Sequence, residues 1–289
     1  MDISTVLVLL LAVVVGLSLG LLGGGGSILT VPLLTYVAGF PPKEAIAASL
    51  LVVGVTSVAS MLAHARRGNV RWRTGLIFGA AGMAGAFVGG LVGGQVPGTI
   101  LMIAFAVMMI ATAAAMLRGR RTRPAPSRDA GGRPWLRIVV DGLVVGLVTG
   151  LVGAGGGFLV VPALALLAGL PMAVAAGTSL LVIAMKSFAG LAGYLTTVSL
   201  DLGIVAGVTA AAVVGSLIGA RLTSRVPEAA LRRGFGYFVL AMGVVVLGQE
   251  LPGAAALVVV TVAVLAAAAA IMCRLVRNRC PWSAQPGLG

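Results

Sequence analysis

The chain has 289 residues, of which 60% are hydrophobic and 9% are charged, and its mean hydropathy is +1.14. Soluble globular domains carry about 25% charged residues, so this composition excludes a soluble protein and indicates a membrane protein with many spans. The net charge of +13 would suggest a nucleic-acid partner in a soluble protein. Here the arginines lie in a few short loops, which indicates contact with anionic lipid headgroups and no nucleic acid.

Continuous apolar runs predict helices along the whole chain, because strands of a membrane barrel would alternate apolar and polar residues. In the first half we expect helices at approximately 3–22, 27–40, 44–63, 74–94 and 98–117. The opening residues "MDISTVLVLL" have no basic region and no clear cleavage site. We therefore expect them to begin the first membrane segment rather than a removed signal.

The second half follows the linker "RGRRTRPAPSRDAGGRPWLR". Its apolar segments lie at 138–152, 157–170, 173–194, 202–220 and 229–249, and a last one spans about 254–273. The pieces at 27–40 and 157–170 are too short for a bilayer core that needs about 20 helical residues. Each of them follows a glycine cluster, so we expect half-helices that belong to a hairpin or a broken helix.

The two halves align without a gap when one is shifted by 130 residues. The matches over some 85 residues include Gly20/Gly150, Gly23/Gly153, Pro32/Pro162, Ser49/Ser179, Gly89/Gly219 and Phe105/Phe235. Leucine-rich helices produce chance identities, but glycine and proline at fixed offsets over this length indicate an internal duplication.

Charge in the loops indicates which way each copy points. The loop "HARRGNVRWR" is basic and its counterpart "YLTTVSLDLG" is not, whereas the next pair, "LVGGQVPG" and "ARLTSRVPEAALRR", reverses this bias. Under the positive-inside rule, equivalent loops then lie on opposite sides of the membrane. A parallel repeat would put the basic residues from Arg221 to Arg233 outside, so we expect two inverted repeats.

The predicted fold class is therefore an all-α polytopic membrane protein with two inverted-topology repeats. Each repeat consists of a glycine-broken hairpin and three transmembrane helices. The expected parts are a first repeat at 1–118, a cytoplasmic Arg-rich linker at 119–137, a second repeat at 138–250, and an extra helix with a cytoplasmic tail at 251–289. We expect a bacterial inner-membrane protein whose N-terminus lies outside.

Inverted repeats with discontinuous helices are a recurring design of secondary transporters. A half-helix that starts inside the membrane presents unpaired N–H groups and a positive dipole end, which can hold an anion. We therefore expect the substrate between the two clusters, at Gly23, Gly24, Gly25, Gly26, Ser27, Gly153, Gly155, Gly156 and Gly157. The alternative is that these glycines only permit close helix packing.

A lysine lies near the middle of the helix predicted at 173–194, in "LLVIAMKSFAG". An ionisable residue at that depth costs about 2.5 kcal/mol or more and indicates function. The nearest acids in the sequence, Asp141 and Asp201, lie at segment ends. We expect Lys186 to contact an anionic substrate. The alternatives are an ion pair with a residue distant in the sequence, or a structural contact with backbone carbonyls.

Hydroxyl groups flank this position. Ser179 lies two turns before Lys186 on the same face, and Ser49 and Thr56 hold the equivalent positions in the first copy. These hydroxyls, with Thr178 as a weaker candidate, donate to the anion or bond to their own helix backbone.

His64, which precedes Arg66 at the predicted cytoplasmic interface, is interpreted as a snorkelling interfacial residue. The acids all lie at segment ends or in loops, so no buried carboxylate relay is visible and the coupling ion stays open.

Enzyme and cofactor sites are not expected. The string "GAGGGF" lacks the alternating strand–helix context of a dinucleotide site, and "GGGGS" lacks the ending of a phosphate-binding loop. The chain offers no constellation of His, Cys and carboxylate residues for a metal.

The chain resembles the TauE/SafE family of anion permeases over about residues 5–250. The resemblance rests on "GGGGSILTVPLL" and "GAGGGFLVVPAL", on the helices "ASLLVV" and "GTSLLVI", and on the loop "ARRGNVRWR". In that loop Arg71 stands where an acid is more usual. The resemblance implies transport of small sulfur-containing or carboxylate anions, such as sulfite or organosulfonates.

Two other functions stay open from the sequence. An anion channel would use the same site without gated exchange, and a membrane subunit or scaffold would not transport by itself. The substrate, the direction of transport, a homo-oligomeric state and the role of the segment at about 254–273 are not predicted.

Overall fold

The structure is a computed structural model that describes residues 3–22, 25–117, 134–153, 160, 164, 172–222 and 228–251. All regular elements in these ranges are helical. They are α1 (Ile3–Leu22), α2 (Thr30–Pro32), α3 (Pro42–Ala65), α4 (Trp72–Gln95), α5 (Gly98–Leu117), α6 (Pro134–Val152), α8 (Met172–Tyr194), α9 (Leu202–Leu222) and α10 (Glu228–Glu250).

The long helices expected from the apolar runs are confirmed wherever the structure describes them. One boundary differs, because α6 begins at Pro134 and the last residues of the predicted linker are helical. Proline is favoured in the first turn of a helix, where its missing N–H leaves no bond unmade. The predicted segments 157–170 and 254–273 lie outside the described residues, except for Val160 and Leu164, which are buried.

The first glycine cluster interrupts a helix, as expected. Helical turns resume at Gly25 and run to Val37 through a 3-10 turn (η1, Gly25–Leu29), α2 and a π turn (η2, Leu33–Val37). The new segment folds back on α1 so closely that a side chain at Gly26 would overlap Ser18 and Leu19. These 13 residues span about 20 Å, so they form a half-helix against a core about 30 Å thick.

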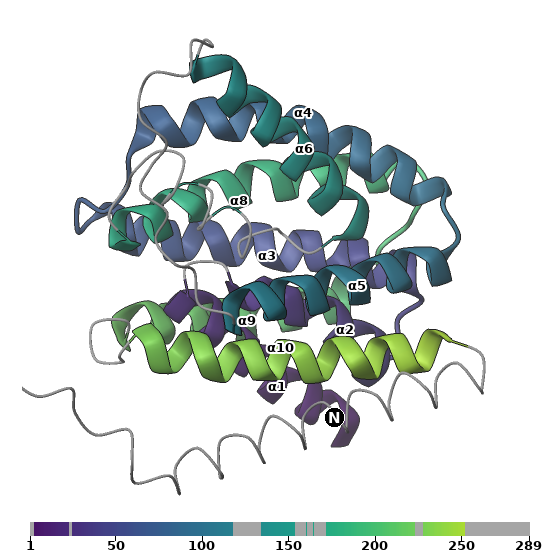
Figure 1. Cartoon of the computed structure of the whole chain (residues 1–289). Coiled ribbons are helices and arrows are strands. Elements are labelled where there is room, and N and C mark those ends of the chain that lie inside the picture. The colour runs from purple at the N-terminus through teal and green to yellow at the C-terminus, as the bar shows by residue number, and fades with distance from the viewer. Residues whose placement is uncertain are drawn as a thin grey trace, which may run out of the picture.

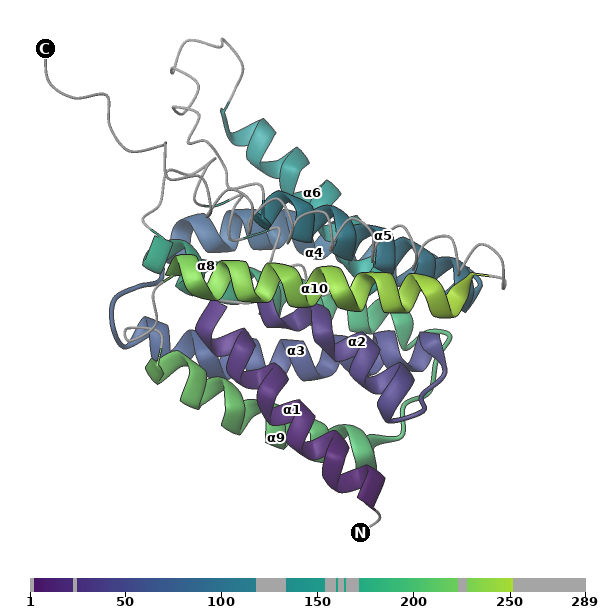
Figure 2. The ribbon, with the colours of Figure 1, turned by 60° about the horizontal axis from the view of Figure 1, so that its bottom comes forward.

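The helices form a bundle with α3 and α8 at its centre. Figure 1 shows α4 crossing α6 on one side of this pair, and Figure 2 shows α1 crossing α9 on the other. The apolar parts of α3 and α8 are 72% and 78% buried, against 44% for α4 and 33% for α9. These four helices are the ones in the described ranges that are long and apolar enough to cross a membrane.

The outer helix pairs pack backbone against backbone at small residues. Gly16 of α1 contacts Ala212 of α9, and Gly146 of α6 contacts Gly82 of α4; a methyl group at either glycine would overlap the facing carbonyl. Glycine thus allows the helices to approach as membrane helices commonly do. The two contacts are equivalent, since each residue of one pair lies 130 positions from its counterpart in the other.

The central helices α3 and α8 run in opposite directions. Gly54 of α3 contacts Phe188 near the end of α8, whereas Gly177 near the start of α8 contacts His64 near the end of α3. These two helices also occupy equivalent places in the two halves of the sequence, 130 residues apart. Equivalent helices therefore lie antiparallel to each other at the centre of the bundle.

Candidate functional site

Lys186 lies in the interior of the bundle, with 2% of its surface exposed. Its Nζ donates a hydrogen bond to Thr149 Oγ1 of α6 at 3.1 Å. An ammonium group carries three N–H donors, and Thr149 is the one acceptor that the described part of the chain supplies. Neither alternative for Lys186, a carboxylate or backbone carbonyls, accounts for this contact in the described ranges.

Small residues make room for the lysine between three helices. The stem of Lys186 passes Gly82 of α4, where an added Cβ would lie 3.9 Å from Lys186 Cδ. Gly82 in turn contacts Gly146, one turn before Thr149 on α6. The alkyl chain of Lys186 is thus packed on the backbone of α4 while its charged end reaches α6, an arrangement that keeps apolar atoms away from water.

Thr149 is a site residue that the sequence interpretation missed. Its hydroxyl donates to Val145 O at 2.7 Å, so its lone pairs remain for Lys186 Nζ. The signal was present, because Thr149 is the one hydroxyl residue in α6 and stands four residues before the second glycine cluster. Its counterpart in the first half is Leu19, so the repeat gave no reason to single it out.

The second glycine cluster begins where α6 ends. Gly153 has a φ of 71°, which favours glycine at a helix C-terminus, and its N–H donates to Thr149 O at 3.0 Å. Its carbonyl accepts a hydrogen bond from Ser49 Oγ of α3 at 3.0 Å. The structure therefore brings Lys186, Thr149, Gly153 and Ser49 together across α8, α6 and α3.

The other predicted hydroxyls bond to their own helices. Thr56 Oγ1 donates to Val52 O at 2.7 Å and Ser179 Oγ donates to Ala176 O at 2.7 Å. Both side chains are fully buried. This is the back-bonding alternative for helical Ser and Thr, and Ser179 also takes part in a further interaction.

The first cluster is described from Gly25 onward. Ser27 is fully buried next to Gly26 and is not without a partner. The predicted residues Gly23, Gly24, Gly155, Gly156 and Gly157 lie outside the described residues.

Thr178 lies away from Lys186, near the start of α8. Its Oγ1 accepts a hydrogen bond from the backbone N–H of Arg71 at 3.0 Å. Eight helical residues separate it from Lys186, which corresponds to about 12 Å. Thr178 therefore anchors the loop before α4, and the structure does not bring it to Lys186.

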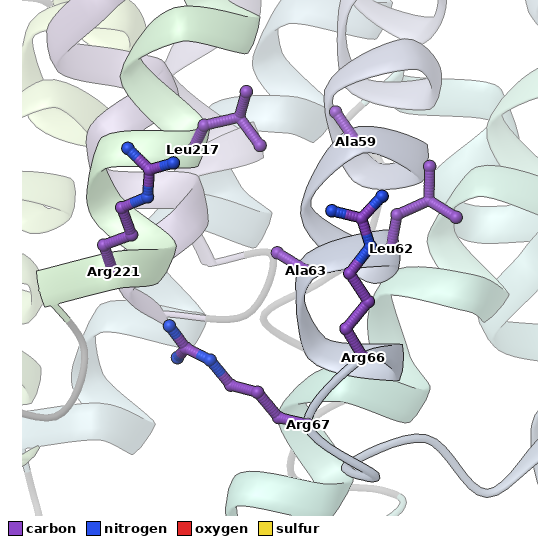
Figure 3. A pocket seen from close by; sticks show the side chains of 7 residues that line it. All are labelled: Ala59, Leu62, Ala63, Arg66, Arg67, Leu217 and Arg221. Carbon is purple, nitrogen blue, oxygen red and sulfur yellow. The ribbon is translucent and has the colours of Figure 1, made fainter.

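Three arginines gather at this end of the bundle. Arg66, Arg67 and Arg221 line a pocket of about 480 Å³ whose other walls are Ala59, Leu62, Ala63 and Leu217, and Figure 3 shows these side chains between the ends of two helices. Arg67 Nη1 donates to Ala220 O at 3.2 Å, which places a cation at the negative end of the α9 dipole. The basic loops of the two halves thus meet.

The interpretation of His64 as a snorkelling residue is wrong. Its side chain is 4% exposed, because Gly177 of α8 packs against it. Both ring nitrogens lack a hydrogen-bond partner in the part of the chain that the structure describes. A histidine at a helix end can turn inward as well as outward, and the packing of α8 on α3 decided between the two.

Known proteins share these sequence features. The family model "Sulfite exporter TauE/SafE" matches residues 8–246. A "Probable membrane transporter protein" of Xylella fastidiosa (strain Temecula1) is 37% identical over 244 residues, which cover 82% of this chain and 92% of that protein. A protein of Methanocaldococcus jannaschii named as a probable membrane transporter is 31% identical over 206 residues, 68% of this chain and 76% of its own length.

A relative in Bacillus subtilis, "Probable membrane transporter protein YdhB", is 27% identical over 78% of this chain and 93% of its own length. No solved structure matches the chain. The glycine clusters and the "ARRGNVRWR" loop all lie inside the range that the family model covers. The chain belongs to the TauE/SafE family.

Proposed function

We propose that the protein is a secondary transporter that moves a small sulfur-containing or carboxylate anion, such as sulfite or an organosulfonate, by alternating access. The observation that carries this proposal is Lys186, a buried cation whose one described partner is the neutral hydroxyl of Thr149. A charged group inside a membrane protein is costly and marks a substrate or ion pathway. The family name and the names of the relatives support transport.

The packing supports an inverted-repeat architecture with repeats at 1–118 and 138–250. Equivalent helices α3 and α8 run antiparallel, as two copies of opposite orientation require. The contact of α1 with α9 corresponds to that of α6 with α4. A transporter of this design alternates between its two open states by rocking one copy against the other.

The substrate site of this proposal lies where the two glycine clusters approach Lys186. The clusters are Gly23 to Ser27 and Gly153 to Gly157, with Ser49 positioning the Gly153 carbonyl. Lys186 supplies the charge for one anion oxygen, and the backbone N–H groups of the half-helices supply neutral donors. Thr56, Thr178 and Ser179 belong to the surrounding shell, since each is bonded to a carbonyl or an N–H group of the protein.

The arginine end faces the cytoplasm in this proposal, which puts the N-terminus outside. The basic residues Arg66, Arg67 and Arg221 meet at one pocket, and the positive-inside rule assigns such an end to the cytoplasmic side of an inner membrane. The apolar walls of the pocket fit the lipid chain of an anionic phospholipid whose phosphate pairs with the arginines.

Flux into proteoliposomes tests the function. Purified protein is reconstituted, and uptake of labelled sulfite, sulfonates and carboxylates is followed with and without the same anion inside. A carrier gives faster uptake when substrate is present on the opposite side, whereas a channel with the same site does not. A protein that moves none of these anions contradicts the proposal and favours a non-transporting membrane subunit.

A further inference from the structure

Three polar side chains form a buried row along one face of α3. Ser57, Ser60 and His64 follow one another at spacings of three and four residues, which places them on the same face of a helix. Ser57 and Ser60 are 0% exposed and His64 is 4% exposed. Neither hydroxyl and neither ring nitrogen has a hydrogen-bond partner within the described ranges.

Serine and threonine in a helix normally satisfy their hydroxyls locally. Ser216 of α9 is equally buried and donates to Val213 O at 2.9 Å, and Thr112 of α5 donates to Met108 O at 2.8 Å. Ser57 and Ser60 could use the same carbonyls on their own helix. Buried polar groups are almost always hydrogen-bonded, so three unpaired ones in a row require an explanation such as a bound solute or water.

The row connects the two charged regions of the molecule. Ser60 follows Ser49 by eleven residues, which is about three helical turns and about 17 Å along the same face. Ser49 donates to Gly153 O at the second glycine cluster. At the other end, His64 is two residues from Arg66, which lines the arginine pocket.

The duplication repeats one of these unpaired hydroxyls. Ser57 corresponds to Ser187, the residue after Lys186 on α8. Ser187 is 1% exposed, and its hydroxyl also lacks a partner among the described residues. The same unpaired, buried hydroxyl thus occurs in both halves, on the two central helices, which an isolated packing defect would not produce.

We propose that Ser57, Ser60 and His64 line a hydrated path that binds the substrate anion between the arginine end and the Lys186–Thr149 centre. The proposal rests on the proposed function and extends it by naming the route. The two hydroxyls and an imidazole N–H donate to the oxygens of a small oxyanion or to its water. None of the three adds a negative charge that would repel it.

Cysteine labelling tests whether the path is open to water. Ser57→Cys and Ser60→Cys are made in a chain carrying Cys273→Ser and Cys280→Ser, reconstituted, and treated with a methanethiosulfonate reagent bearing a sulfonate. Ser216→Cys is the matched control, because Ser216 is equally buried but bonded to its own helix. We expect the two row positions to react about tenfold faster or more than the control, as a pathway for anions implies. Equal rates overturn the proposal.

Alanine variants then separate binding from structure. Ser57→Ala and Ser60→Ala remove hydroxyls that have no protein partner in the described chain, so the melting temperature should stay unchanged or rise. If the hydroxyls bind the anion, flux falls by about tenfold, and Ser216→Ala leaves flux unchanged. A higher melting temperature with undiminished flux contradicts the proposal.

The two proposals fail separately. If the wild-type protein transports none of the anions, the proposed function is wrong, yet labelling still decides whether the row is hydrated. If the protein transports and the row cysteines do not react, the function stands and the route is wrong. His64→Gln, which keeps a side-chain N–H donor, should retain more flux than His64→Ala in a functioning transporter.

Discussion

The two central helices, α3 and α8, have equivalent places in the sequence but unequal chemistry. Thr56 of α3 bonds to its own backbone at Val52 O, whereas its counterpart on α8, Lys186, reaches another helix at Thr149. The partner position is unequal too, since Thr149 corresponds to Leu19. Lysine and its acceptor therefore occur together in one half and are both absent from the other.

The far ends of the two helices differ in the same way. His64 ends α3 with both ring nitrogens unpaired within the described residues. Its counterpart, Tyr194, ends α8 and donates from its hydroxyl to Leu151 O at 2.5 Å. The comparison teaches that a near-symmetric scaffold carries an asymmetric polar interior, with one satisfied end and one unsatisfied end.

The largest effect is expected from removing the unmatched charge. Lys186→Met should lower anion flux by about 100-fold or more, because a hydrogen bond from a charged group to the substrate is worth about 1.5–3 kcal/mol. Its folding stability should hold, since a buried charge is replaced by an apolar chain of similar length. Flux and melting temperature are measured on the same preparation.

Lys43→Met is the control for this change. Lys43 Nζ donates to Gly94 O at 2.9 Å, at the end of α4 that lies away from the arginine loop. It should transport like the wild type. Normal transport by Lys186→Met would show that the asymmetry of the two helices has no role in transport.

Alanine at the paired glycines tests the symmetric part of the comparison. Gly16→Ala and Gly146→Ala each place a methyl group on a facing carbonyl, and overpacking of this kind costs about 1–3 kcal/mol. The two variants should lose similar stability in thermal unfolding in detergent. Gly207→Ala is the control, because its added Cβ would meet one side-chain atom at 3.6 Å. A large difference between the first two would mean that the halves do not pack equivalently.

Thr149→Val tests whether the acceptor matters as well as the charge. It keeps the shape of the side chain but leaves Lys186 Nζ without its described acceptor. A lost bond of this kind is worth about 1–1.5 kcal/mol, so flux should fall by about tenfold. Thr149→Ser should restore it, since the hydroxyl returns. If valine and serine behave alike, Thr149 only fills space.

The smallest effect is expected at the arginine pocket. Arg221→Gln should reduce the stabilisation of the protein by anionic phosphatidylglycerol relative to phosphatidylcholine by about 1 kcal/mol, read as a smaller shift in melting temperature. Arg73→Gln, which alters an arginine that does not line the pocket, should change this shift less. Equal shifts in both variants would indicate a general charge effect rather than a lipid site.

Much of the fold could be predicted because its determinants are local. Long apolar runs give helices wherever they occur, and the glycine cluster after α1 gives a break because glycine is a poor helix former. The spacing of the halves also placed Thr56 opposite Lys186 and Ser49 opposite Ser179. The orientation of the repeats was predicted from loop arginines, and the meeting of Arg66, Arg67 and Arg221 at one pocket agrees with it.

The partners of the polar side chains could not be predicted from the sequence. Thr149 lies 37 residues from Lys186 and Ser49 lies 104 residues from Gly153, so no local pattern relates them. Hydroxyls on a helix have a local alternative in their own backbone. Thr56 and Ser179 took it, while Ser57 and Ser60 did not. The burial of His64 likewise depends on where Gly177 packs.

The sequence by itself determined the helices, the duplication and the lone buried lysine, because hydrophobic length, glycine and charge act over a few turns of the chain. Only the tertiary structure decided that Lys186 meets Thr149, that Ser49 meets Gly153, and that α3 carries an unpaired polar row. Those contacts depend on the register in which glycine-faced helices pack, which no single segment contains.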